Sequence, residues 1–209
     1  KASAILIIAL SIYTGVFIQG ASYAANQDEA IRYQRYGKVL DWLNQNASKE
    51  EVVFANSELS HLIVIYTPLN IFQQLPLTVG ISFSASEDRL LNALFLLYRL
   101  DGVGKREEAQ EVFFRDRAVI SWSIYGIYYR EAAGAYQNIP DEVIRNILQK
   151  YQESLAIPTA DFLNLSWSKY EVKYLIWDKK YNPQWQLDQY QFLEKVAEIE
   201  DFAIYQMPQ

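Results

Sequence analysis

The sequence predicts an α/β protein in which an N-terminal helix of transmembrane type leads to a small, mostly parallel sheet with a large helical insertion. Three observations predict this class. Residues 2–27 carry no charged side chain, short apolar runs rich in β-branched residues follow, and the middle of the chain has helical spacing. We therefore divide the 209 residues into a segment 1–27 and an α/β domain 28–209, whose helical insertion covers about residues 84–155.

The uncharged segment begins after Lys1 and ends before Asp28. Its core, residues 4–18, is apolar. Together with the Gly, Ala and Ser residues that follow, the segment reaches the roughly 20 residues that a spanning helix needs. Ser22-Tyr-Ala24 also resembles the small-residue cleavage point of a secretory signal, so cleavage is a second interpretation.

A third interpretation, a buried helix of a globular protein, is weakened because the segment has no polar face. The chain begins with Lys1 rather than Met, so we expect it to come from a longer protein. A hydrophobic segment at the point where this chain would be cut from the longer protein is most naturally the last transmembrane helix of that protein.

Four elements follow in the first part of the domain. Charged and apolar residues alternate with helical spacing over Asp28–Asn46. Val52–Ala55 is a short β-branched run of the kind buried in parallel sheets. A helix then begins at Asn56 and ends near Pro68, which disfavours helix in the residue before it. Leu69–Phe72 is the next predicted strand, so this part has a tight βαβ-like order.

The predicted insertion begins with a capping box, Ser84-Ala-Ser-Glu87, which starts a helix over Asp88–Leu100. Gly102 and Gly104 are expected to end that helix. Helical spacing continues over 105–136, and Pro140 opens another helix that runs to Tyr151.

Strand and helix patterns return in the C-terminal part. Val172–Trp177 predicts a strand and Asn182-Pro183 a turn. Leu187–Val196 predicts a helix and Phe202–Tyr205 a last strand. The domain would then contain four strands.

Composition excludes several classes of function. The net charge of −6 and the pI near 4.9 argue against nucleic acid as a partner. There is no cysteine, which removes disulfides, thiolate nucleophiles and thiolate metal sites. His61 is the only histidine, and there is no cysteine. The chain therefore lacks the residues that a typical zinc site or an acyl-transfer triad requires. We therefore expect no cofactor, no metal site and no catalytic residue in this chain.

The best candidate for a ligand site is the carboxyl edge of the predicted strands, where open α/β sheets bind ligands. Asn56, Ser57 and Glu58 follow the first strand, and Asp178 and Lys179 follow the third. The alternative is ordinary loop polarity, with Ser57 as a helix cap.

Several short segments, in their order along the chain, carry a family resemblance. They are Val39–Asn44, Glu51–Ala55, Tyr66-Thr67, Asn70–Phe72, Val172–Asp178 and Phe202–Gln206. The chain resembles the C-terminal extracytoplasmic part of large bacterial polytopic membrane proteins of the GT-C glycosyltransferase type. This resemblance implies a parent enzyme that moves a sugar from a polyprenyl-phosphate donor. The acidic catalytic residues of that family lie in early loops that have no counterpart here.

We therefore expect a noncatalytic extracytoplasmic accessory domain of an integral membrane protein. Its partners would be the lipid bilayer and, through the parent protein, a lipid-linked sugar or glycan acceptor. The alternative from another class is a secreted or membrane-anchored α/β protein that binds a small ligand at the strand edge. An independent hydrolase has the least support, because no nucleophile–base pair is recognisable.

Overall fold

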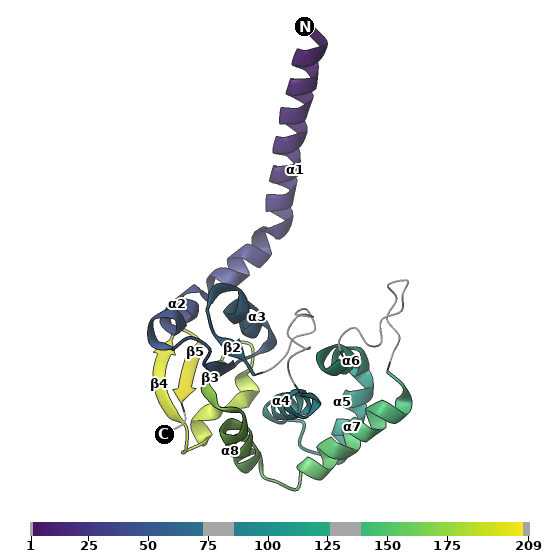
Figure 1. Ribbon diagram of the computed structural model, residues 1–209, viewed down its shortest axis with the longest axis vertical. Helices are drawn as coiled ribbons and strands as arrows, with labels where there is room; N and C mark the ends of the chain where they lie inside the picture. The colour runs from purple at the N-terminus through teal and green to yellow at the C-terminus, as the bar shows by residue number, and fades with distance from the viewer. Residues whose placement is uncertain (1, 73–85, 126–138, 207–209) are drawn as a thin grey trace. The chain divides into compact units, whose positions relative to one another are not determined.

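The computed structural model describes residues 2–72, 86–125 and 139–206 (Figure 1). The chain divides into two compact units, Lys1–Lys38 and Val39–Gln209. The second unit confirms the predicted α/β class, because a five-stranded sheet lies between helices.

The first unit is dominated by α1, Ala2–Gln34. A turn at residues 35–36 separates it from α2, Gly37–Asn46, so the helix predicted over Asp28–Asn46 is divided in two. Among the side chains that the structure describes, no helix has both the length and the apolarity needed to cross a bilayer. This finding does not bear out the spanning helix predicted over residues 1–27, of which the side chains of residues 1–9 lie outside the described part.

The sheet of the second unit has the strand order β2-β1-β3-β5-β4. Strand β1 (Val52–Phe54) pairs in parallel with both β2 (Asn70–Ile71) and β3 (Val172–Asp178). Strand β5 (Phe202–Gln206) runs antiparallel to β3 and to β4 (Glu194–Ile199). The sheet is therefore mixed, with a parallel half built early in the chain and an antiparallel half built late.

The strands predicted near residues 52, 69, 172 and 202 are confirmed as β1, β2, β3 and β5. Between β1 and β2 lies α3, Ser57–Tyr66, which ends at the Thr67-Pro68 pair as expected. Central strands β3 and β5 are almost completely buried, which explains why their sequences are mostly apolar.

The helix predicted over Leu187–Val196 is wrong. The structure has a short 3-10 turn at Leu187–Gln189 and then strand β4. β4 is one of the two edge strands, with one side against β5 and little of its surface buried. Its charged residues, Glu194, Lys195 and Glu198, protect an exposed edge from pairing with other chains. Their spacing also resembles that of the polar face of a helix, which explains the wrong prediction.

Between β2 and β3 the described chain is helical. The helices are α4 (Glu87–Leu100), α5 (Arg106–Arg115), α6 (Arg117–Tyr125), α7 (Asp141–Ser154) and α8 (Thr159–Tyr170). Sequence reasoning omitted α8, which follows the predicted insertion. Gly102 ends the α4 region with a φ of 90°, a conformation that a residue with a Cβ adopts only with strain.

Ser86, rather than the predicted Ser84, is the N-cap of α4. Its hydroxyl accepts a hydrogen bond from the amide of Arg89 at 3.3 Å. Ser84 lies outside the described residues.

Replacing Ser86 by alanine is expected to destabilise the protein by about 1 kcal/mol, because an amide in the first turn of α4 loses its acceptor. Ser86→Asp retains an acceptor and should remain near wild type. Urea unfolding of the three proteins measures the effect. Equal losses for the alanine and aspartate variants would contradict the cap.

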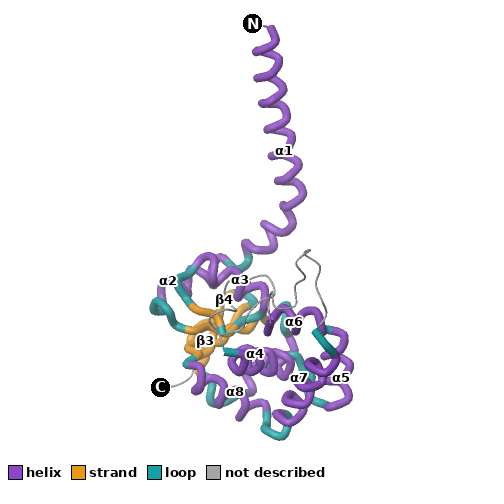
Figure 2. Tube along the Cα trace, turned by 45° about the vertical axis from the view of Figure 1, so that its right-hand side comes forward, coloured by secondary structure: helices purple, strands orange, loops and turns teal. Residues whose placement is uncertain are grey.

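Helices cover both faces of the sheet (Figures 1 and 2). Helices α2 and α3 lie on one face, and α4 and α8 lie on the other. Alternate residues of the central strands point to opposite faces, so Leu175 and Trp177 join the large core beneath the insertion. Tyr174 instead packs edge-on against Trp42 of α2, with ring centroids 5.6 Å apart. These layers of helices flank the carboxyl ends of β1 and β3, which the sequence predicted as a ligand site.

Candidate functional site: the carboxyl ends of β1 and β3

The candidate site lies where the connections from the sheet change direction. From β1 the chain passes through α3 to β2 on one side, and then through the helical insertion to β3 on the other. The gap between the carboxyl ends of β1 and β3 is thus the topological switch point, the usual place for a ligand in an open α/β sheet. Asn56 and Asp178 stand at these two strand ends.

Asn56 is both a helix cap and a bridge between strands. Its Oδ1 accepts a hydrogen bond of 2.9 Å from the amide of Leu59, which makes it the N-cap of α3. Its Nδ2 donates to Oδ1 of Asn182 at 2.9 Å and lies 3.5 Å from Oδ2 of Asp178. Asn56 is therefore the N-cap of α3, whereas the interpretation of this loop as ordinary polar surface had assigned the cap to Ser57.

Asp178 is 1% exposed, yet its carboxylate has several donors. Oδ1 accepts hydrogen bonds of 3.1 Å from the amides of Lys180 and Tyr181. The backbone carbonyl of Asp178 accepts from the amide of Asn182 at 2.8 Å, closing the turn after β3. A buried carboxylate needs such donors because it has lost its water.

The other three predicted residues do not converge on this point. Ser57 is exposed and Glu58 is half-buried in the first turn of α3. Lys179 turns to β4, where its Nζ lies 2.5 Å from Oε1 of Glu198. The structure thus brings together Asn56 and Asp178, and adds Asn182, which sequence reasoning had identified only as part of a turn.

Aromatic side chains fill the space beside this cluster of Asn56, Asp178 and Asn182. Nε1 of Trp177 donates to the carbonyl of Asn182 at 2.7 Å. Trp185, 1% exposed, stacks on Phe54 with ring centroids 5.6 Å apart. The switch point is therefore occupied by the protein's own polar and aromatic groups. Within the described structure, the amides and the carboxylate of the cluster hydrogen-bond one another.

A half-buried carboxylate, that of Asp101, which was not predicted from the sequence, ties the insertion to the sheet. Asp101 follows α4, and its Oδ1 accepts hydrogen bonds of 2.8 Å from Nε1 of Trp185 and from Nε2 of Gln184. Burial raises the pKa of Asp101, and the two donors partly oppose this rise. No sequence pattern links residues 84 positions apart, so only the fold could reveal the contact.

The raised pKa of Asp101 predicts a pH dependence of stability. The folded chain holds this proton more tightly than the unfolded chain, whose aspartate pKa is about 3.9. The contribution of Asp101 is therefore complete below that value and declines as the pH rises through the folded pKa. We expect the stability of the wild type, relative to Asp101→Asn, to fall across this window.

Urea unfolding of both proteins at stepped pH values tests this expectation. Taking the difference between the two proteins removes the opposite trend from Asp88, Asp188 and Glu198, whose pKa values are lowered by hydrogen bonds to lysines. A difference that is constant with pH would contradict the assignment.

Other candidate groups give no site. Among the described residues, no three His, Asp or Glu side chains are placed to hold a metal ion. Nδ1 of His61 is buried without a hydrogen-bond partner in the described part of the chain. The chain has no second histidine with which it could form a metal site or a relay.

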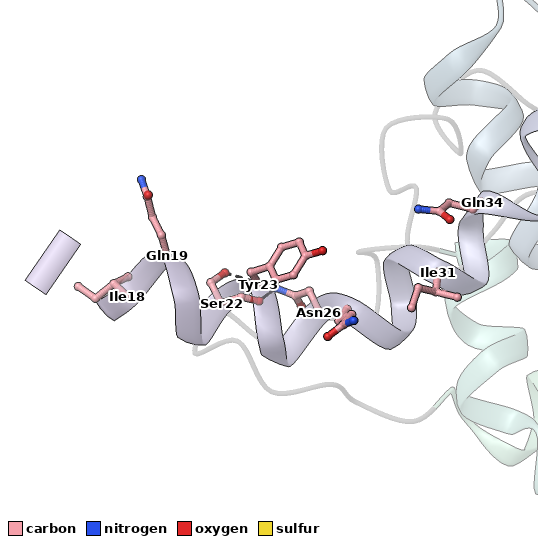
Figure 3. Close-up of a pocket in the computed structure, with 8 residues that line it drawn as sticks. Ile18, Gln19, Ser22, Tyr23, Asn26, Ile31 and Gln34 are labelled. Carbon is pink, nitrogen blue, oxygen red and sulfur yellow. Dashed lines mark hydrogen bonds between the residues drawn. The ribbon is translucent and has the colours of Figure 1, made fainter. Parts of the chain in front are cut away.

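A hollow runs along α1 (Figure 3). The residues that line it all belong to this helix: Ile18, Gln19, Ser22, Tyr23, Asn26, Gln27, Ile31 and Gln34. One helix cannot enclose a ligand, so the hollow is the space between neighbouring side chains on its surface.

Comparisons with protein families, curated proteins and solved structures find no match to this chain.

Proposed function

We propose that this chain is a noncatalytic extracytoplasmic accessory domain of an integral membrane protein, and that α1 associates with the bilayer. The carrying observation is that the uncharged run of residues 2–27 forms part of one continuous helix. Its described apolar side chains are more than half exposed, and their positions surround the helix axis: Leu10, Ile12, Val16, Phe17 and Ile18. A helix that is apolar on all sides is stable when protein or lipid surrounds it.

The parent protein, in this proposal, transfers a sugar from a polyprenyl-phosphate donor. The support is the order of short segments that resembles the C-terminal part of GT-C glycosyltransferases. The closed cluster at the switch point agrees with an accessory role, because its carboxylate and amides are engaged in structural hydrogen bonds. The same closure weighs against the alternative of a small-ligand-binding protein that uses this edge.

Flotation with liposomes tests the membrane proposal. The full chain is reconstituted with phosphatidylcholine vesicles, washed with alkaline carbonate and floated on a density gradient. We expect it to remain with the vesicles. The triple variant Ile12→Lys, Val16→Lys, Ile18→Lys should be released, since each lysine at the centre of a membrane helix costs about 3 kcal/mol.

A matched control places lysines at exposed apolar positions of the α/β unit, Ile65, Val119 and Leu165. This control should float like the wild type. Release of the wild type by carbonate would refute the proposal. Intact-mass measurement of the protein recovered from cells addresses the secreted alternative, which requires cleavage after Ala24.

A further inference from the structure

Two neighbouring hollows on the helical insertion form an open groove. The first is lined by residues of α4, α7 and α8 and has a volume of about 430 Å³. The second extends along α7 to α6, with a volume of about 450 Å³. Glu87 and Lys150 line both. Each hollow has the size of a small-molecule site.

The floor of the groove is apolar and its rim is polar. Leu91, Phe95 and Phe162, each almost completely buried, form the floor of the first hollow. Ile147 and the half-buried Tyr125 contribute to the second. A ligand that fits must therefore offer both apolar surface and polar edges.

Several rim groups have unused hydrogen-bonding capacity. The Asn92 amide has one hydrogen-bond partner among the described residues, the hydroxyl of Ser166, so one of its two polar atoms is uncommitted there. The side chains of Glu87, Asn146 and Lys150 form no hydrogen bond or ion pair with any described residue. This differs from the switch point, where the polar groups satisfy one another.

Charge restricts the ligand further. Among the residues that the structure describes, the carboxylates of Glu87, Asp88 and Glu153 line the groove together with one ammonium group, that of Lys150. Asp88 is already engaged, 2.6 Å from Nζ of Lys169. An anionic ligand would be repelled by this surplus of negative charge, so a phosphate or an acidic peptide does not fit.

We infer that this groove binds an uncharged sugar chain. Sugar hydroxyls both donate and accept, which matches the mixture of amide, carboxylate and ammonium groups on the rim. The C–H faces of sugar rings match the apolar floor. This inference rests on the proposed accessory function and specifies its ligand as the glycan, rather than the phosphate, part of a lipid-linked sugar or acceptor.

Saturation-transfer NMR on the full chain tests the inference. The protein is held in lauryldimethylamine oxide micelles, since a detergent with a sugar headgroup would compete. The probes are maltotriose, chitotriose and mannotriose. We expect a signal from at least one of them, and a loss of affinity of about tenfold in the variant Asn92→Ala, Lys150→Ala, which removes two donors.

The matched control is Asn164→Ala, Lys105→Ala, which removes the same residue types at exposed positions outside the groove lining. It should bind like the wild type. Absence of signal from all three probes, or equal binding by the groove variant, would overturn the inference. Neither result affects the membrane proposal, which the flotation experiment decides separately.

Discussion

Replacing Trp185 by alanine is expected to lower the free energy of unfolding by about 3–5 kcal/mol, the largest effect of any single substitution proposed for this chain. Trp185 is 1% exposed and stacks on Phe54 of β1. It also donates to the half-buried carboxylate of Asp101 at 2.8 Å. The substitution would thus open a cavity between the sheet and the insertion and remove a donor from a carboxylate that has few others.

Trp185→Phe separates the two contributions. It retains an aromatic ring against Phe54 but cannot donate to Asp101, so we expect a loss of about 1–3 kcal/mol. Trp42→Phe is the matched control, because Trp42 is only half-buried and its ring contacts Tyr174 edge-on. Chemical denaturation followed by circular dichroism measures all three. A loss below 1 kcal/mol for Trp185→Ala would show that the two parts do not depend on this contact.

The second large effect is expected at the switch point. Asp178→Ala should destabilise the protein by about 2–4 kcal/mol, because the amides of Lys180 and Tyr181 lose their acceptor in a buried place. Nδ2 of Asn56 would keep only its bond to Asn182.

Asp178→Asn retains one carbonyl oxygen as acceptor, so we expect a smaller loss than for alanine. Asp161→Ala, at an exposed position of α8, controls for the loss of a carboxylate and should lie within about 0.5 kcal/mol of wild type. Thermal unfolding gives the comparison. If Asp178→Ala and Asp161→Ala unfold at the same temperature, the buried cluster does not stabilise the fold.

Much of this fold could be predicted because its central strands carry a strong local signal. β1 and β3 are largely buried on both faces, so their sequences are mostly apolar, with β-branched residues such as Val52, Val172 and Ile176 among them. β4 could not be predicted, because an edge strand with charges at Glu194, Lys195 and Glu198 has the polar spacing of a helix. The order of strands in the sheet depends on pairing between distant segments, which local patterns do not contain.

Part of the geometry at the candidate site could be predicted from the sequence. Strand ends followed by polar residues correctly placed Asn56 and Asp178 beside each other. The sequence could not show that Asn182 bonds to Asn56, or that Trp177 donates to the carbonyl of Asn182. In a sequence, a polar residue that binds a ligand cannot be distinguished from one that hydrogen-bonds to its own chain. Lys179 was misplaced because it points to β4, a strand that the sequence did not predict.

Strand β5 has a consequence for how the chain is made. It is the last described element of the sequence, yet it occupies the interior of the sheet, where β3 and β4 both pair with it. During synthesis, β4 emerges with no neighbour and the core beneath β3 stays open until Phe202–Gln206 arrives. The ribosome must therefore deliver nearly all of this domain before it can fold, so a chaperone has a long interval in which to hold it.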